Sequence, residues 1–347
     1  MKKYFWFLLL VSVIALMLVG GLGCQTPTDE GTDESADEEV VDDQTWVLKL
    51  GNIDAVGNPA HLANEKLVEL VAEKTDGRVT IELYPASQLG GAIDQIESIA
   101  MGTQEMGEFA ATFYGQYIKD YNIISLAFLF EDQDHQIAFL NSDLNQEIKD
   151  KYAEEYGVRI IAENWLRPPN VIATTKSVQS LEDLSGLKMR VPEIEMYLLN
   201  WTQLGTNPTV VAWGEVYLAL EQGVVEGVDM PFDFIRGMKF YEPAPYVLMT
   251  NHLLTNANVI INDEVWQSMP EDIQNALVEA AEEAGDYYTE LAKTVVEEDY
   301  QWLLEQGVEI YEVDPAPFME KMAPLALELE EKDYWSAGLY DQIQALK

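Results

Sequence analysis

Short apolar runs alternate with amphipathic stretches from Thr45 to the end of the chain. Runs such as TWVLKLGN (45–52) and RVTIELYP (78–85) are typical of strands, and between them residues 61–77 repeat their apolar positions with helical spacing. The alternation continues with predicted helices at 91–102, 193–205 and 214–223, and with predicted strands at 157–163, 170–176 and 224–231. Because helices separate most of the strands, the pattern predicts an α/β fold of parallel strands with βαβ crossovers.

A much longer helical pattern runs from Pro270 to Gln306. Proline suits the start of a helix, and Gly285 is expected to interrupt this one. About 300 residues follow Thr45, which is enough for two lobes of ordinary size. A helix of this length among otherwise short elements is expected to span both lobes.

The N-terminus indicates export. Two lysines precede an apolar run from Tyr4 to Val19, and small residues precede Cys24, the only cysteine. We predict a signal peptide over 1–23 and lipidation of Cys24, although Gly21 stands where such cleavage sites usually have leucine. The alternative is an ordinary secretory signal with an incidental cysteine. Residues 24–44 are expected to form a flexible tether, because they are rich in acids and nearly devoid of apolar side chains.

The composition is strongly acidic. The chain has 61 Asp and Glu against 20 Lys and Arg, for a net charge of −41, and the acids are spread over the whole sequence. Nucleic acid and anionic lipid surfaces are therefore poor partners, and we expect the membrane to be reached only through the lipid anchor. We interpret the charge as adaptation to a salty or alkaline exterior, where repulsion is screened. The alternative is simply an acidic exported protein.

Signatures of catalysis are absent from the sequence. It contains no G-x-S-x-G, no phosphate-binding loop, no dinucleotide fingerprint after a strand and no H-E-x-x-H. The histidines His61, His135 and His252 lack metal-ligand spacing and are expected to be surface or packing residues. We therefore expect no cofactor and no metal, and we predict a binding protein in preference to an enzyme.

One arginine has an unusual place in the pattern. In GLKMRVP (186–192), Leu187, Met189 and Val191 alternate with polar residues, which predicts a strand with Arg190 near its end. A guanidinium offers a planar fork to a carboxylate, so Arg190 is a candidate anchor for an anionic ligand. The alternative is an ordinary salt bridge to one of the many acids.

Several motifs in a fixed order resemble one known family. PASQLGG, GLKMRVP, GTNP, WGEVYLALEQGVVEG and KFYE together resemble the DctP-like solute-binding proteins of TRAP (tripartite ATP-independent periplasmic) transporters. The resemblance implies two α/β lobes of the periplasmic-binding-protein type, joined by hinge strands and a long helix. The two lobes are expected to close on a small organic anion. We expect lobe I to comprise 45–167 plus about 256–295, and lobe II 168–255 plus about 296–347.

The resemblance also implies a set of ligand-binding residues. Arg190 occupies the position of the family's carboxylate-binding arginine, and Trp213 that of an aromatic residue against the ligand, with core packing as its alternative role. Where many members carry a second arginine this chain has Asn170, and Arg167 is the candidate to supply that charge from a displaced position. Met230 replaces the family's ligand-binding asparagine. The remaining expected neighbours of the ligand are Asp229, Phe232 and Phe234.

These features predict a lipid-anchored extracytoplasmic protein that delivers a small organic acid to a TRAP membrane permease. Because Asn170 and Met230 replace more polar residues, a monocarboxylate is expected in preference to a C4-dicarboxylate or a sialic acid. If Arg167 reached the cleft, it would favour binding of a second carboxylate. The alternatives are an ectoine-like zwitterion as ligand, an ABC-type or sensor partner, an exported hydrolase or lyase, and a structural surface lipoprotein that binds no small molecule.

Overall fold

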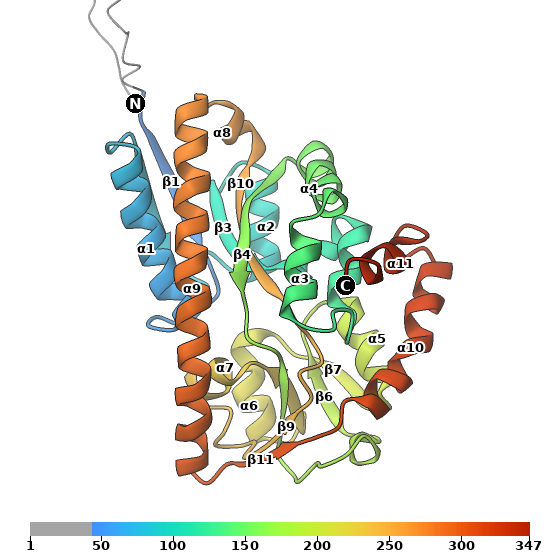
Figure 1. Ribbon diagram of the computed structural model, residues 1–347. Helices are drawn as coiled ribbons and strands as arrows, with labels where there is room; N and C mark the ends of the chain where they lie inside the picture. The colour runs from blue at the N-terminus through green and yellow to red at the C-terminus, as the bar shows by residue number, and fades with distance from the viewer. Residues whose placement is uncertain (1–43) are drawn as a thin grey trace, which may run out of the picture. The chain divides into compact units, whose positions relative to one another are not determined.

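The computed structural model describes residues 44–347, and the predicted signal peptide, Cys24 and nearly all of the predicted tether lie outside them. The described chain contains two β-sheets with helices packed around them (Figure 1). The first sheet has the order β2-β1-β3-β10-β4 and is formed by β1 (Trp46–Gly51), β2 (Val79–Tyr84), β3 (Met106–Ala110), β4 (Val158–Leu166) and β10 (Asn256–Asn262). The second has the order β11-β9-β5-β8-β6-β7 and is formed by β5 (Val171–Thr174), β6 (Lys188–Val191), β7 (Asn207–Val210), β8 (Gly227–Met230), β9 (Tyr246–Met249) and β11 (Glu309–Glu312).

The predicted helices are present as α1, α2, α5, α6 and α9, and the described chain contains six more that were not predicted. The α-helices are α1 (Pro59–Lys74), α2 (Ala92–Ala100), α3 (Gln133–Leu140), α4 (Asp143–Tyr156), α5 (Glu195–Gln203), α6 (Val216–Glu221), α7 (Phe232–Gly237), α8 (Asp263–Gln267), α9 (Glu271–Glu305), α10 (Ala316–Glu331) and α11 (Leu339–Gln344). Short 3₁₀ turns are η1 (Ala111–Gln116), η2 (Lys119–Ser125), η3 (Glu182–Leu184) and η4 (Trp213–Glu215). The predicted two-sheet α/β class is confirmed.

Both sheets are mixed, which the sequence pattern did not predict. β4 and β10 are antiparallel neighbours in the first sheet, and β5 and β9 are antiparallel neighbours in the second. The chain passes from β4 to β5 and returns from β9 to β10 through short connections. The prediction of parallel units with βαβ crossovers is therefore wrong for β4, β5, β9 and β10, which form a two-stranded antiparallel ribbon running from one sheet into the other.

Helix α9 contributes to the cores of both sheets. Its buried residues from Ile273 to Ala292 pack with β1, β4 and β10 of the first sheet, whereas Leu303 packs with strands of the second. Figure 1 shows the helix passing alongside both sheets. The helix is continuous for 35 residues, so Gly285 does not interrupt it, contrary to expectation.

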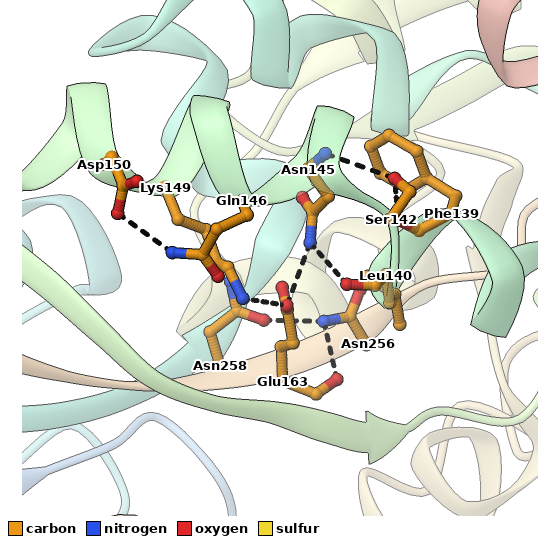
Figure 2. Close-up of polar contacts among 10 residues, drawn as sticks. All are labelled: Phe139, Leu140, Ser142, Asn145, Gln146, Lys149, Asp150, Glu163, Asn256 and Asn258. Carbon is orange, nitrogen blue, oxygen red and sulfur yellow. Dashed lines mark hydrogen bonds and ion pairs between the residues drawn. The ribbon is translucent and has the colours of Figure 1, made fainter.

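A bulge near the end of β4 is held by polar side chains. Between Ala162 and Trp165, β4 contains one residue more than β10 opposite it, so part of its backbone cannot pair within the sheet. Asn256 donates to the carbonyl oxygen of Glu163, while Lys149 and Asn145 of α4 bind the Glu163 carboxylate (Figure 2). These contacts anchor the strand from which Arg167 extends.

Helix α9 supplies the remaining partner of the bulge. The Thr289 hydroxyl donates to the Asn164 carbonyl oxygen and accepts from the Leu166 N–H, at 2.9 and 3.0 Å. Buried backbone groups need hydrogen-bond partners, and these side chains supply them where the strand pairing is irregular. Side chains of α4 and β10 and the Thr289 side chain of α9 therefore fix the backbone that leads into Arg167.

The C-terminal segment joins parts of the chain that the predicted division separates. Helix α10 packs with α5, but Ser336 then donates to Asp120, and the carbonyl oxygen of Ile343 lies 2.8 Å from Nε2 of His135. The predicted division gave 119–135 to lobe I and the C-terminus to lobe II. These contacts show that the last residues lie against the former segment, and the lobe boundaries remain a prediction.

Candidate functional site

Residues at the carboxyl ends of strands from both sheets line one cavity. Asp54 follows β1, Thr112 follows β3 and Arg167 follows β4, while Arg190 and Met230 lie at the ends of β6 and β8. In open α/β sheets, ligands bind outside this end of the strands. The cavity measures about 80 Å³, room for about six water molecules at 10–15 Å³ each. A small molecule fits this space, whereas a folded segment does not.

A larger cavity of about 600 Å³ adjoins the first. It has five lining residues in common with the small one, namely Ile53, Phe113, Arg190, Pro192 and Trp213. The two cavities therefore form the inner and outer parts of one cleft, with Arg190 at their junction.

Arg190 is buried, and its terminal nitrogens are left for a ligand. Its side chain is 2% exposed, its Nε donates to the Val211 carbonyl oxygen at 3.0 Å, and its guanidinium carbon lies 5.7 Å from the centre of the Trp213 ring. Among residues 44–347 no carboxylate forms an ion pair with it. Burial lowers the pKa of Arg190 to about 10, with Asp229 and Tyr197 acting in the opposite direction, so the group stays cationic at neutral pH.

Arg167 reaches the same cavity. Its guanidinium carbon lies 4.7 Å from the centre of the Phe234 ring, and its backbone N–H donates to the Thr255 carbonyl oxygen at 3.0 Å. Burial alone would lower the pKa of Arg167, but Tyr288, Asp54 and Asp233 around it raise the pKa. Two acids, Asp54 and Asp233, therefore act on Arg167, whereas within residues 44–347 Asp229 is the one acid that acts on Arg190.

Two buried carboxyl groups lie beside Arg167 in the cavity wall. Glu108 of β3 is 2% exposed and Asp54 is 8% exposed, and Asn64 of α1 donates to Glu108 Oε2 at 3.1 Å. Burial, followed by the facing Asp54, raises the pKa of Glu108 well above its usual range. Glu108 therefore holds a proton more readily than an ordinary glutamate does.

A strained turn holds the segment that carries Asp54. Ala86 and Ser87, in the PASQLGG motif, have φ angles of 54° and 60°, which are unfavourable for residues other than glycine. Their N–H groups donate to the carbonyl oxygens of Asp54 and Asn52, both at 3.0 Å. These two hydrogen bonds require the strained conformation, and they hold the loop after β1 against the cavity.

Aromatic side chains form much of the remaining wall. The Trp213 ring makes edge contacts with Phe234 and Phe240, each with ring centres 5.7 Å apart. Phe113, Tyr197 and Tyr288 also line the cavity. Trp213 therefore packs on the core of the second sheet and also lines the cavity, and its contact with a ligand stays a prediction.

Three predicted ligand neighbours lie behind the cavity wall. Asn170 is buried, with its backbone N–H bonded to the Leu253 carbonyl oxygen, and Phe232 packs its ring against Tyr300 within the core. Asp229 is 1% exposed and lies 3.2 Å from Nε2 of His252, whose Nδ1 is 2.7 Å from the Thr250 hydroxyl. These side chains support the wall and do not line it.

The sequence analysis missed the carboxyl pair. Glu108 is an acid within the apolar strand MGEFA, and this unusual position is the signal that could have identified it. Asp54 and Glu108 are 54 positions apart, and they meet because β1 and β3 pair in parallel with Gly51 beside Gly107. Tyr197, Tyr288 and Phe113 were likewise missed.

No helix among residues 44–347 combines the length and apolar character needed to span a bilayer.

Comparisons with known proteins agree with this geometry. A solute-binding protein of Roseobacter denitrificans is 32% identical over 279 residues, which cover 79% of this chain and 84% of the relative. A TRAP periplasmic solute-binding protein of the same organism, solved with bound β-D-glucuronate, superposes with a TM-score of 0.83 at 28% identity and covers 87% of this chain and all of its own. One from Haemophilus influenzae with bound L-gulonate gives a TM-score of 0.81 at 25% identity, covering 87% of this chain and 99% of its own.

The family itself is shown by the extent of the sequence match. Residues 50–333, most of the described chain, match the family described as bacterial extracellular solute-binding protein, family 7. The chain therefore belongs to this DctP family, whose members are the extracytoplasmic solute-binding proteins of TRAP transporters.

Proposed function

We propose that this protein captures a small hydroxylated monocarboxylate, of the sugar-acid type, between its two lobes and delivers it to a TRAP membrane permease without chemical change. The observation that carries the proposal is Arg190, a buried cation at the mouth of the inner cavity with no ion-pair partner among the described residues. A buried charge is strongly favoured to find a partner, and a ligand carboxylate completes the pair.

The rest of the cavity suits the body of a sugar acid. Its other charged groups, the buried Asp54 and Glu108 and the partly exposed Arg167, are hydrogen-bonding partners for hydroxyl groups, and Trp213 and Phe113 offer apolar surface to ring or chain carbons. The related structures with β-D-glucuronate and L-gulonate support this ligand class, since both molecules carry one carboxylate and several hydroxyls. An ectoine-like zwitterion is the second candidate, because carboxyl groups at one end of the cavity suit a cationic ligand group.

Capture is proposed to close the cleft, so that the permease distinguishes loaded from empty protein. The β4–β5 and β9–β10 connections and α9 are the segments that would bend, because they alone among the described strands and long helices link the two sheets directly. Lipidation of Cys24 is proposed to hold the protein at the outer face of the membrane, near that permease.

A thermal-shift screen tests the proposal. The panel comprises D-glucuronate, L-gulonate, succinate, ectoine and, as the matched neutral control, D-glucose. A ligand at about 100 times its Kd adds roughly 2.7 kcal/mol to the free energy of unfolding, which raises Tm by several degrees. We expect shifts with the sugar acids and none with glucose. A larger shift with succinate, or shifts with ectoine alone, would contradict the sugar-acid assignment.

A further inference from the structure

The charged groups of the inner cavity form two separate ends. Arg190 belongs to the second sheet and faces Asp229 and Tyr197. Glu108 and Asp54 belong to the first sheet and face each other, with Asn64 and Arg167 as their other polar neighbours. A ligand whose carboxylate binds Arg190 therefore presents its far end to the Glu108–Asp54 pair.

Both members of the pair are held by contacts with the surrounding first-sheet elements. Glu108 lies on a strand whose five residues are all buried, and its Oε2 accepts from Asn64, which is itself fully buried. Asp54 accepts from Asn58 at 3.4 Å, and its own backbone carbonyl oxygen accepts from Ala86. Side chains held by such surrounding contacts define a fixed pattern of acceptors.

Arg167 lies at this end of the cavity near several carboxyl groups, although none of those among residues 44–347 forms an ion pair with it. Asp54 and Asp233 both face its guanidinium, and Glu108 is close enough to feel its charge as well. Burial and the facing Asp54 raise the pKa of Glu108, whereas Arg167 acts to lower it, so the carboxyl groups of this end and the positive charge of Arg167 act on each other. An end lined by carboxyl oxygens that already have a neighbouring cation suits hydroxyl groups better than a second carboxylate.

We propose that Glu108 and Asp54 are the specificity-determining pair of the cleft, which binds hydroxyl groups at the ligand's far end and excludes a second carboxylate there. This inference rests on the proposed function, since it presupposes a sugar acid anchored at Arg190. On this proposal, the carboxyl groups near Arg167 leave it less able than Arg190 to bind a second carboxylate.

Three probes differ only at the far end. L-gulonate, D-glucuronate and D-glucarate have the same stereocentres and one carboxylate in common, and carry an alcohol, an aldehyde in equilibrium with its hemiacetal, and a second carboxylate at the other terminus. Isothermal titration calorimetry on the mature protein gives a Kd for each. We expect gulonate or glucuronate to bind at least 100-fold more tightly than glucarate. Equal binding of glucarate by the unaltered protein would overturn the inference without any variant.

Two substitutions locate the discrimination in the pair. Glu108→Gln and Asp54→Asn keep the shape but replace a carboxyl oxygen with an amide that donates to a second carboxylate. Each should reduce the ratio of the glucarate Kd to the gulonate Kd at least tenfold. Unchanged ratios in whichever variants fold, as judged by Tm and circular dichroism, would count against the pair.

A control variant tests whether the discrimination against glucarate comes from the Glu108–Asp54 pair or from the overall negative charge of the protein. Glu193 lies at the rim of the outer cavity, so Glu193→Gln removes one negative charge from the cleft without touching the pair. It should leave the ratio within twofold of the unaltered protein, and an equal loss of discrimination would assign the effect to overall charge and refute the proposal. If neither gulonate nor glucuronate binds at all, the proposed function fails, and this inference fails with it.

Discussion

Gly285 of α9 lies so close to Asn164 of β4 that a Cβ atom at position 285 would be 2.3 Å from Oδ1 of Asn164. The same Cβ would be 2.6 Å from Cδ1 of the buried Trp165, whose ring stacks on Tyr288. The sequence pattern had suggested a break in the helix at this glycine. The structure shows a continuous helix in which the missing side chain lets the bulge of β4 pack against α9.

Gly285→Ala should therefore destabilise the fold even though alanine is the better helix former. Overpacking a core costs about 1–3 kcal/mol, against about 1 kcal/mol that alanine gains over glycine inside a helix. We expect a net loss of up to about 2 kcal/mol in the free energy of unfolding, measured by urea denaturation. Gly237→Ala is the matched control, because no atom lies within 4 Å of a Cβ at that position. Equal stability of the two variants would show that the contact at Gly285 is unimportant.

Arg190→Ala should abolish measurable binding of the sugar acid found in the screen. Truncating one side of a buried, hydrogen-bonded charge pair costs about 2–5 kcal/mol, which is roughly 30-fold or more in Kd. Arg190→Lys should recover only part of the affinity, because lysine lacks the planar fork and the bond from Nε to the Val211 carbonyl oxygen.

Arg159→Ala provides the control for this prediction. Arg159 also lies over a tryptophan ring, 5.9 Å from the centre of Trp266, but it lies outside the cleft. Calorimetry that finds Arg190→Ala as tight as Arg159→Ala would remove Arg190 from the site.

The fold could be predicted from the sequence wherever a local pattern determined an element. Period-2 alternation gave the strand that holds Arg190, and helical spacing gave α1 and α9 within a few residues of their observed bounds. Strand direction was not predictable in the same way. The antiparallel insertion of β5 and β10 depends on how the chain passes between two sheets, and no local spacing records that path.

The site could be predicted only where a single residue carried an unusual signal. Arg190 stood out because a chain poor in positive charge had placed an arginine in an apolar strand. Glu108 and Asp54 meet through the register of β1 on β3, and Arg167 reaches the cavity after a bulge that requires Asn256 and Thr289 as partners. These contacts join residues that are far apart in the sequence, so no local sequence pattern predicts them.

Asp233 should make the protein less stable as the pH rises from about 4 to about 7. Its side chain is 6% exposed, its Oδ1 has no hydrogen-bond partner among residues 44–347, and burial raises its pKa to about 7, against the attraction of Arg167. An unfolded aspartate releases its proton near pH 4, so between these values unfolding releases a proton and stability falls with increasing pH. Asp233→Asn removes that proton release.

The difference in Tm between Asp233→Asn and the unaltered protein should therefore grow from near zero at pH 4 to a clear stabilisation at pH 8. Thermal melts at constant ionic strength across this range measure it. Glu320→Gln, an exposed change on α10, serves as the control and should show no such trend. A constant difference for Asp233→Asn would mean that the buried carboxyl is already ionised at pH 4.

The acidic surface should make the fold depend on salt. With a net charge of −41, most acids have no basic partner, and their mutual repulsion acts over about 30 Å at 0.01 M salt but only about 8 Å at 0.15 M. We expect Tm to rise steeply up to about 0.3 M NaCl and more slowly toward 1 M, where the screening length is about 3 Å.

A comparison of two salts separates charge screening from the strengthening of apolar burial. Screening depends on ionic strength, whereas the strengthening of apolar burial depends on the kind of salt, with sulfate the more effective. NaCl and Na₂SO₄ at matched ionic strength below 0.3 M should therefore raise Tm equally. A flat curve in NaCl, or a rise found only in sulfate, would show that charge repulsion does not limit the stability of this protein, and adaptation to a salty exterior would lose its physical basis.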